Sequence, residues 1–79
     1  MKLEISTPQK TIFEGDVRSV QCPGKDGIFQ ILKNHAPMIA ILVKGRVKYE
    51  VPDDATSYFV EINRGVLQVS DNKITILSE

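Results

Sequence analysis

Turn-forming residues interrupt this chain about every eight to twelve positions, which leaves no room for long regular elements. The clearest interruptions are Pro23 to Gly27, Pro52 to Asp54, and Asp71 to Asn72. Between them, no helical spacing of apolar residues persists over the roughly 10 to 12 positions that a helix prediction requires. Gly27 is expected to take the positive φ at the end of the first reversal. The chain is therefore predicted to consist of short strands joined by tight turns.

The runs between these turns alternate apolar and polar residues, as strands with one buried face do. Gly45 to Val51 is the clearest case, because Val47 and Tyr49 share one face while Arg46 and Lys48 share the other. The other residues predicted to face a core are Leu3, Ile5, Val20, Cys22, Tyr58, Val60, Ile62, Leu67, Val69, Ile74 and Ile76. We predict an all-β fold, an antiparallel β-sandwich or flattened barrel of about ten short strands.

One run breaks the alternation. From Ala36 to Val43 the chain has eight consecutive apolar residues, whereas an antiparallel strand with one wet face should alternate. The run could be a strand buried on both sides. It could instead carry an outer face on which another protein docks.

Composition limits the class of protein. The chain has 79 residues, enough for one domain, and its ten basic and ten acidic residues cancel. A net charge of zero argues against nucleic acid or an anionic membrane surface as the main partner. The single Cys22 cannot form an internal disulfide, and no run approaches the roughly 20 apolar residues of a membrane span. We expect a soluble protein of a reducing compartment that contacts other proteins and does not insert into a membrane.

The chain contains no recognisable constellation of catalytic residues. Cys22 and His35 could meet in space, but nothing in the sequence supplies a third group. One His, one Cys and scattered carboxylates do not make a metal site. The run Gly24 to Gly27 has the spacing of the GXXG loop of RNA-binding KH domains, but it joins predicted strands rather than helices. We predict no enzyme activity, no cofactor and no bound metal.

The run PGKDGIFQILKNHAP, from Pro23 to Pro37, resembles the signature of the epsilon subunit of F-type ATP synthases. The similarity continues through Leu3 to Pro8, Phe13 to Gly15, Gly65 to Val69 and Asn72 to Leu77, and so spans nearly the whole chain. The matching residues in the central run are Pro23, Gly24, Gly27, Phe29, Ile31, Leu32, Asn34, His35, Ala36 and Pro37. The resemblance implies one epsilon-type β-sandwich domain over residues 1–79.

In that family the sandwich is a rotor part that couples rotation of the membrane c-ring to the gamma shaft. The resemblance therefore implies two protein partners, gamma and the c-ring, and a peripheral location on the cytoplasmic face of the bacterial inner membrane. The residues carried over by position to the gamma contact are His35, Met38, Ala40, Asn63 and Gln68. Those carried over to the c-ring contact are Thr7, Pro8 and Ile28. Many relatives have a polar or acidic residue in place of Ile28, which could alternatively be a core residue.

Relatives usually continue into a C-terminal helical hairpin that can inhibit ATP hydrolysis and in some bacteria binds ATP. This sequence ends at Glu79, so we expect the helical domain and both activities to be absent. Its Met1 and the lack of a tag favour a short natural form.

A second hypothesis is a stand-alone β-barrel of the OB or cold-shock kind that binds nucleic acid or another ligand. Such modules stack bases on exposed aromatic side chains over a basic groove. Here the aromatic residues are few and mostly in phase with the predicted core, and the net charge is zero. The candidates are Phe13, Phe29, Tyr49, Tyr58 and Phe59.

Overall fold

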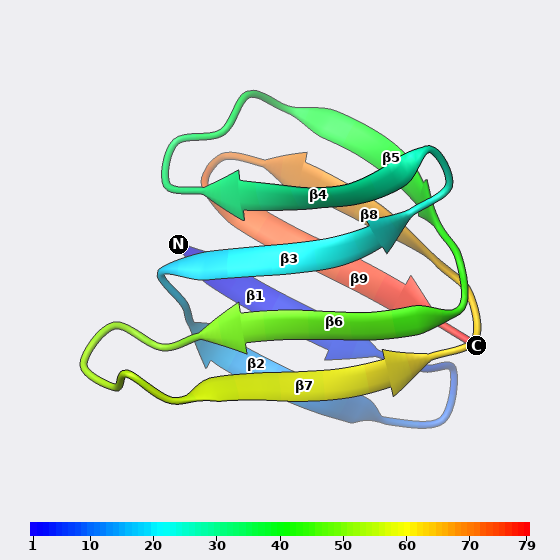
Figure 1. The fold of residues 1–79 in the computed structure, drawn as a ribbon, viewed down its shortest axis with the longest axis horizontal. Helices are drawn as coiled ribbons and strands as arrows, with labels where there is room; N and C mark the ends of the chain where they lie inside the picture. Colours follow the sequence, from blue (N-terminus) through cyan, green and yellow to red (C-terminus); the bar gives the residue numbers. More distant parts are fainter.

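The computed structural model describes all residues from Met1 to Glu79 as nine strands and the turns between them, with no helix (Figure 1). The predicted all-β class is confirmed. The structure has nine strands, and the sequence predicted about ten. The strands are β1 (Lys2–Ser6), β2 (Thr11–Asp16), β3 (Ser19–Gly24), β4 (Gly27–Leu32), β5 (Met38–Leu42), β6 (Gly45–Glu50), β7 (Ser57–Ile62), β8 (Gly65–Ser70) and β9 (Lys73–Ser78).

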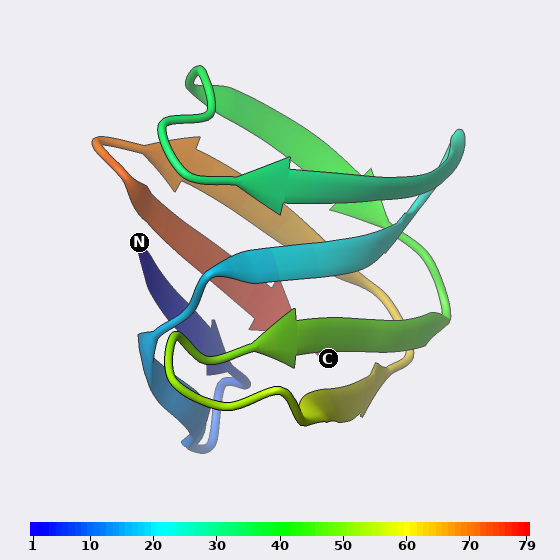
Figure 2. The ribbon, with the colours of Figure 1, turned by 60° about the vertical axis from the view of Figure 1, so that its left-hand side comes forward.

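The strands form two curled layers that pack face to face, as Figures 1 and 2 show. One layer has the order β2-β1-β9-β8-β5, and the other has the order β4-β3-β6-β7. The layers join where β5 meets β3, at the single pair Gly24 and Leu42. The sandwich prediction is confirmed by this arrangement.

One pairing departs from the antiparallel prediction, because β1 and β9 run parallel. The sequence neighbours that pair are joined by short connections, which require antiparallel pairing; they are β1–β2, β3–β4, β6–β7 and β8–β9. The first and last strands come from opposite ends of the chain, so no turn between them dictates their relative direction. The parallel pair places Leu3 beside Ile74 and Ile5 beside Ile76, four core side chains in one region of the sheet.

The core lies between the two layers and receives side chains from eight of the nine strands. The alternation read from the sequence has the correct phase, since Val47, Leu67 and Ile76 are fully buried. The prediction that Tyr58 is a core residue is wrong, because its side chain is 39% exposed. The full set of buried apolar residues is Leu3, Ile5, Val17, Val20, Cys22, Ile31, Leu42, Val47, Tyr49, Ile62, Leu67, Val69, Ile74 and Ile76. β2 contributes the half-buried Phe13, whose ring packs against this set.

Cys22 is a core residue, as the sequence predicted. Its side chain is fully buried, and burial raises the pKa of its thiol to about 12. A thiol with so high a pKa is almost entirely protonated near neutral pH, and the thiolate is the reactive form. Cys22 therefore contributes packing rather than chemistry.

Three stacked aromatic rings connect the layers on the side away from β5. The ring of Phe13 on β2 lies 4.2 Å from that of Tyr49 on β6, and Tyr49 lies 5.5 Å from Tyr58 on β7. The hydroxyl of Tyr58 donates a 2.6 Å hydrogen bond to Asp54 Oδ2, and this bond holds the pKa of Tyr58 above its usual value. The stack anchors the β6–β7 hairpin over β2.

The turns gather at the two ends of the sandwich (Figure 1). The end that we call the C-terminal end carries the turns 7–10, 25–26, 43–44 and 63–64, together with Glu79. The opposite, N-terminal end carries Met1 and the loops 17–18, 33–37, 51–56 and 71–72. Gly27 has φ 127°, and Asp71 and Asn72 have φ 52° and 60°, so the predicted reversals at these positions are confirmed.

Candidate protein-binding surfaces

The apolar run Ala36 to Val43 is not buried on both sides. Within it, β5 turns Leu42 into the core and exposes 74% of Ile39 and 58% of Ile41. The interpretation as a strand buried within the domain is therefore wrong. One face of β5 is open to solvent although it carries large aliphatic side chains.

Neighbouring strands extend this bare surface. Ile41 pairs with Val66 of β8, and Val66 pairs with Leu77 of β9, so their side chains form a row across three strands. Val66 and Leu77 are both exposed. We call Ile39, Ile41, Val66 and Leu77 the apolar face. Contiguous exposed apolar side chains on a small domain make this surface a candidate interaction site.

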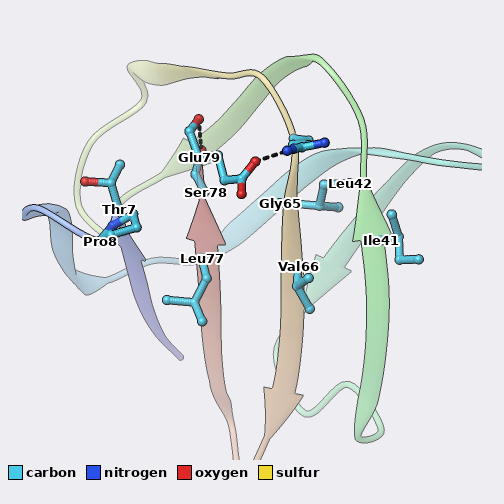
Figure 3. A pocket seen from close by; sticks show the side chains of 10 residues that line it. Thr7, Pro8, Ile41, Leu42, Gly65, Val66, Leu77, Ser78 and Glu79 are labelled. Atoms are coloured by element: carbon cyan, nitrogen blue, oxygen red, sulfur yellow. Dashed lines mark hydrogen bonds and ion pairs between the residues drawn. The ribbon is translucent and has the colours of Figure 1, made fainter.

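A groove of about 610 Å³ lies at the edge of the apolar face nearest the C-terminal end (Figure 3). Ile41, Val66 and Leu77 form its apolar wall, and Thr7 and Pro8 approach it from the β1–β2 turn. An ion pair between Arg64 and Glu79 lies at its rim, marked by a dashed line in Figure 3. The groove thus joins the apolar face to the turns at this end.

The three residues predicted to face the c-ring lie at one end of the molecule. Thr7 and Pro8 occupy the β1–β2 turn, where Thr7 Oγ1 accepts hydrogen bonds from the backbone N–H groups of Gln9 and Lys10 at 3.3 and 3.2 Å. Ile28 follows the β3–β4 turn and is 72% exposed. The alternative that Ile28 is a core residue is therefore wrong.

The residues predicted to face gamma are not on one surface. Gln68 lies on the outside of β8 and pairs with Ile39, so it borders the apolar face. Met38 and Ala40 are half-buried and pack against the core from the inner side of β5. Both line an opening of about 570 Å³ between β5 and the β3–β4 hairpin.

His35 and Asn63 are both exposed, but they lie at opposite ends of the sandwich. His35 belongs to the β4–β5 loop, where its Nδ1 lies 2.7 Å from the carbonyl oxygen of Ala36. The preceding Asn34, with φ 65°, donates its backbone N–H to Asn72 Oδ1 at 3.3 Å. Asn63 follows β7 at the C-terminal end, so one small partner surface cannot contact both residues.

Sequence reasoning offered an outer docking face on the run Ala36 to Val43 but missed the extension of that face to Val66 and Leu77, although a signal for it was present. Leu67 and Val69 were predicted to point inward, which implies that Val66 points outward. By the same alternation, an inward Ile76 implies an outward Leu77. For β5 no such inference was available, because both phases of its apolar run look alike until its pairing with β8 is known.

The structure brings no three His, Cys, Asp or Glu side chains together in a way that could hold a metal ion. It also has no helix long and apolar enough to cross a membrane. Of the aromatic residues, Tyr49 is buried, Phe13 and Phe29 pack against the core, and Phe59 is exposed on the outer face of β7.

Comparison with known proteins agrees with the observed β-sandwich fold. Residues 1–79 match the family model described as "ATP synthase, Delta/Epsilon chain, beta-sandwich domain". The chain belongs to this family. The ATP synthase epsilon chain of Chlorobium limicola is 47% identical over 78 residues, covering 99% of this chain and 88% of the relative. That of Nitratiruptor sp. is 44% identical over 79 residues, covering all of this chain and 60% of the relative.

Solved structures share the delta/epsilon fold. A chain in the Euglena gracilis mitochondrial ATP synthase, in a structure of its OSCP/F1/c-ring part, superposes with a TM-score of 0.88 over 96% of this chain and 48% of its own length. A chain in the Tetrahymena thermophila structure of the central stalk and c-ring gives 0.80 over 98% and 61%. Both are 18% identical to this chain and support the fold alone.

Proposed function

We propose that this member of the delta/epsilon family is a non-catalytic rotor subunit of an F-type ATP synthase, in which it couples rotation of the c-ring to the gamma shaft. The observation that carries the proposal is the apolar face, on which four large aliphatic side chains are exposed to solvent. The other large aliphatic side chains of β1, β8 and β9 are packed in one buried core. Family membership supports the assignment to the ATP synthase. The complex would hold the chain peripherally on the cytoplasmic face of the bacterial inner membrane.

The role requires two contact surfaces on one body, and the sandwich has two that suit it. We assign the gamma contact to the apolar face with the adjoining Gln68, and to the opening lined by Met38 and Ala40. We assign the c-ring contact to the C-terminal end, through Thr7, Pro8 and Ile28. His35 and Asn63 could each border the gamma contact only if gamma spans the length of the sandwich.

A torque-transmitting element must not deform between its two contacts. Close-packed protein interiors have low compressibility and transmit strain. Here the two layers enclose one continuous core, and the ring stack of Phe13, Tyr49 and Tyr58 connects them at the side away from β5. The fold supports rigid coupling without any chemical step.

Mixing the purified chain with its cognate gamma subunit tests this proposal. We expect the two to co-elute in size-exclusion chromatography and hydrogen exchange to slow in β5 and β8, because docking would cover their outer faces. Separate elution, or protection confined to β6 and β7, would contradict the assigned gamma contact.

A second test concerns ATP hydrolysis. The 79 residues contain no helix that could extend along a shaft, so we propose that they couple rotation without inhibiting hydrolysis. Adding the chain to an epsilon-depleted enzyme is expected to restore coupled ion pumping and leave maximal hydrolysis within about twofold. Strong inhibition of hydrolysis by the purified chain would refute this part of the proposal.

A further inference from the structure

A second groove, of about 390 Å³, lies on the outer face of the other layer, away from the apolar face. It has three basic side chains, Lys44, Arg46 and Lys48, and no acidic residue in its lining. Four apolar side chains, Pro23, Ile28, Val43 and Phe59, complete its surface together with Gln21 and the glycines 24, 27 and 45. We call this the basic groove. In a chain of zero net charge, it is a local concentration of positive charge.

The three cations form no ion pair within the chain, although Glu61 and Glu79 line a neighbouring cavity together with Lys44 and Arg46. The ion pairs of the structure are Arg18–Glu50, Arg64–Glu79 and Lys73–Glu4. Glu61 pairs with Arg46 across the β6–β7 hairpin, yet the two side chains form no ion pair. Instead, the guanidinium of Arg46 lies 4.7 Å from the centre of the Phe59 ring, a cation–π contact that holds it over the groove.

The nearest carboxylate along β6 is already engaged. Glu50 accepts hydrogen bonds from Arg18 at 3.1 Å and from Ser57 at 3.0 Å, and the bond from Ser57, followed by that from Arg18, holds its pKa below the usual range. Glu50 forms no ion pair with Lys48, whose charge nevertheless contributes to lowering the Glu50 pKa after the two hydrogen bonds. The cations of the basic groove remain available to an external anion.

Their spacing indicates the shape of that anion. Arg46 and Lys48 are alternate residues of β6, so their Cα atoms are separated by about 7 Å along the strand, and Lys44 adds a third cation from the bend that precedes it. An extended peptide with carboxylates at alternate positions presents negative charge at the same interval. The apolar side chains of Ile28 and Phe59 flank this line and can cover the methylene groups of such a peptide.

We propose that the basic groove binds an extended acidic segment of a partner protein, with carboxylates at every second residue facing Lys44, Arg46 and Lys48. This contact is distinct from the gamma contact, because it uses the outer face of β3, β4, β6 and β7, and it shares only Ile28 with the residues assigned to the c-ring. It does not depend on the assignment of the apolar face. A groove of about 390 Å³ on one face of a layer suits a single peptide better than the broad plane of a lipid surface.

Fluorescence anisotropy with a labelled peptide that has Glu at alternate positions tests the proposal. We expect binding to the intact chain that weakens as salt is added, because the contacts are exposed and electrostatic. The double variant Arg46→Glu/Lys48→Glu should bind about tenfold more weakly, since each reversed charge removes an attraction and adds a repulsion. The conservative variant Arg46→Lys/Lys48→Arg should retain most of the affinity.

A matched control distinguishes binding in the groove from a general effect of the net charge of the chain. The double variant Lys2→Glu/Lys33→Glu changes net charge equally at exposed sites outside the groove, and it should bind the peptide nearly as well as the parent chain. Equal weakening in both double variants would overturn the proposal, as would no binding by the parent chain. Binding of phosphatidylglycerol vesicles through the groove residues, with no binding of the peptide, would also overturn it in favour of a lipid surface.

Discussion

Replacing Leu67 with alanine is expected to lower the free energy of unfolding by about 2–5 kcal/mol. Leu67 is fully buried in the middle of β8, where its loss leaves a cavity between the two layers. A domain of this size has a total stability of only about 4–12 kcal/mol. The variant should therefore lose much of its stability margin, and part of the population should unfold near physiological temperature.

Leu77→Ala is the matched control, since it makes the same chemical change on the adjacent strand at a side chain that is 58% exposed. Its effect should stay within about 0.5 kcal/mol. Urea denaturation of both variants, followed by circular dichroism, measures the difference through the midpoint at constant slope. Similar losses at the two positions would mean that the two layers do not form one packed core.

Ile41→Glu is expected to weaken binding of gamma about a hundredfold or more. If gamma covers the apolar face, the substitution places a carboxylate without a partner in a dry contact, and central interface residues each contribute about 2 kcal/mol or more. The isolated chain should tolerate the change, because Ile41 is exposed and its side chain leaves the core untouched. Isothermal titration of each variant with gamma measures the loss.

Leu32→Glu is the control for this prediction. Leu32 is 54% exposed on β4 in the other layer, so the substitution introduces the same charge away from the apolar face. Thermal unfolding should show that both variants fold. Unchanged affinity of Ile41→Glu, or an equal loss in Leu32→Glu, would show that gamma binds elsewhere.

A charge at Ala40 of β5 is a less informative test of the gamma contact than a charge at Ile41. Ala40 was assigned by resemblance to the gamma contact, and it is half-buried against the core on the inner side of β5. A charge there would disturb packing and docking together. Ile41 on the outer side of the same strand separates the two effects.

Much of the fold follows from the sequence alone. The alternation in Gly45 to Glu50 and in the last two strands has the predicted phase, because a regular strand must send successive side chains to opposite faces. The positive φ of Gly27, and the reversal at Asp71 and Asn72, follow from residue types that tolerate the left-handed region. The central motif was sufficient to suggest the family.

The candidate surfaces depended on contacts between distant residues. Local alternation determined which side chains share a face, but only the pairing of β5 with β8 decided which face of the uniformly apolar run is bare. Likewise, adjacency of β3, β4, β6 and β7 brings Ile28 beside Lys44 and Phe59 in one groove, and the strand directions separate Asn63 from His35. The physical reason is that a strand pattern repeats every two residues along one chain segment, whereas exposure depends on which segments come together in space.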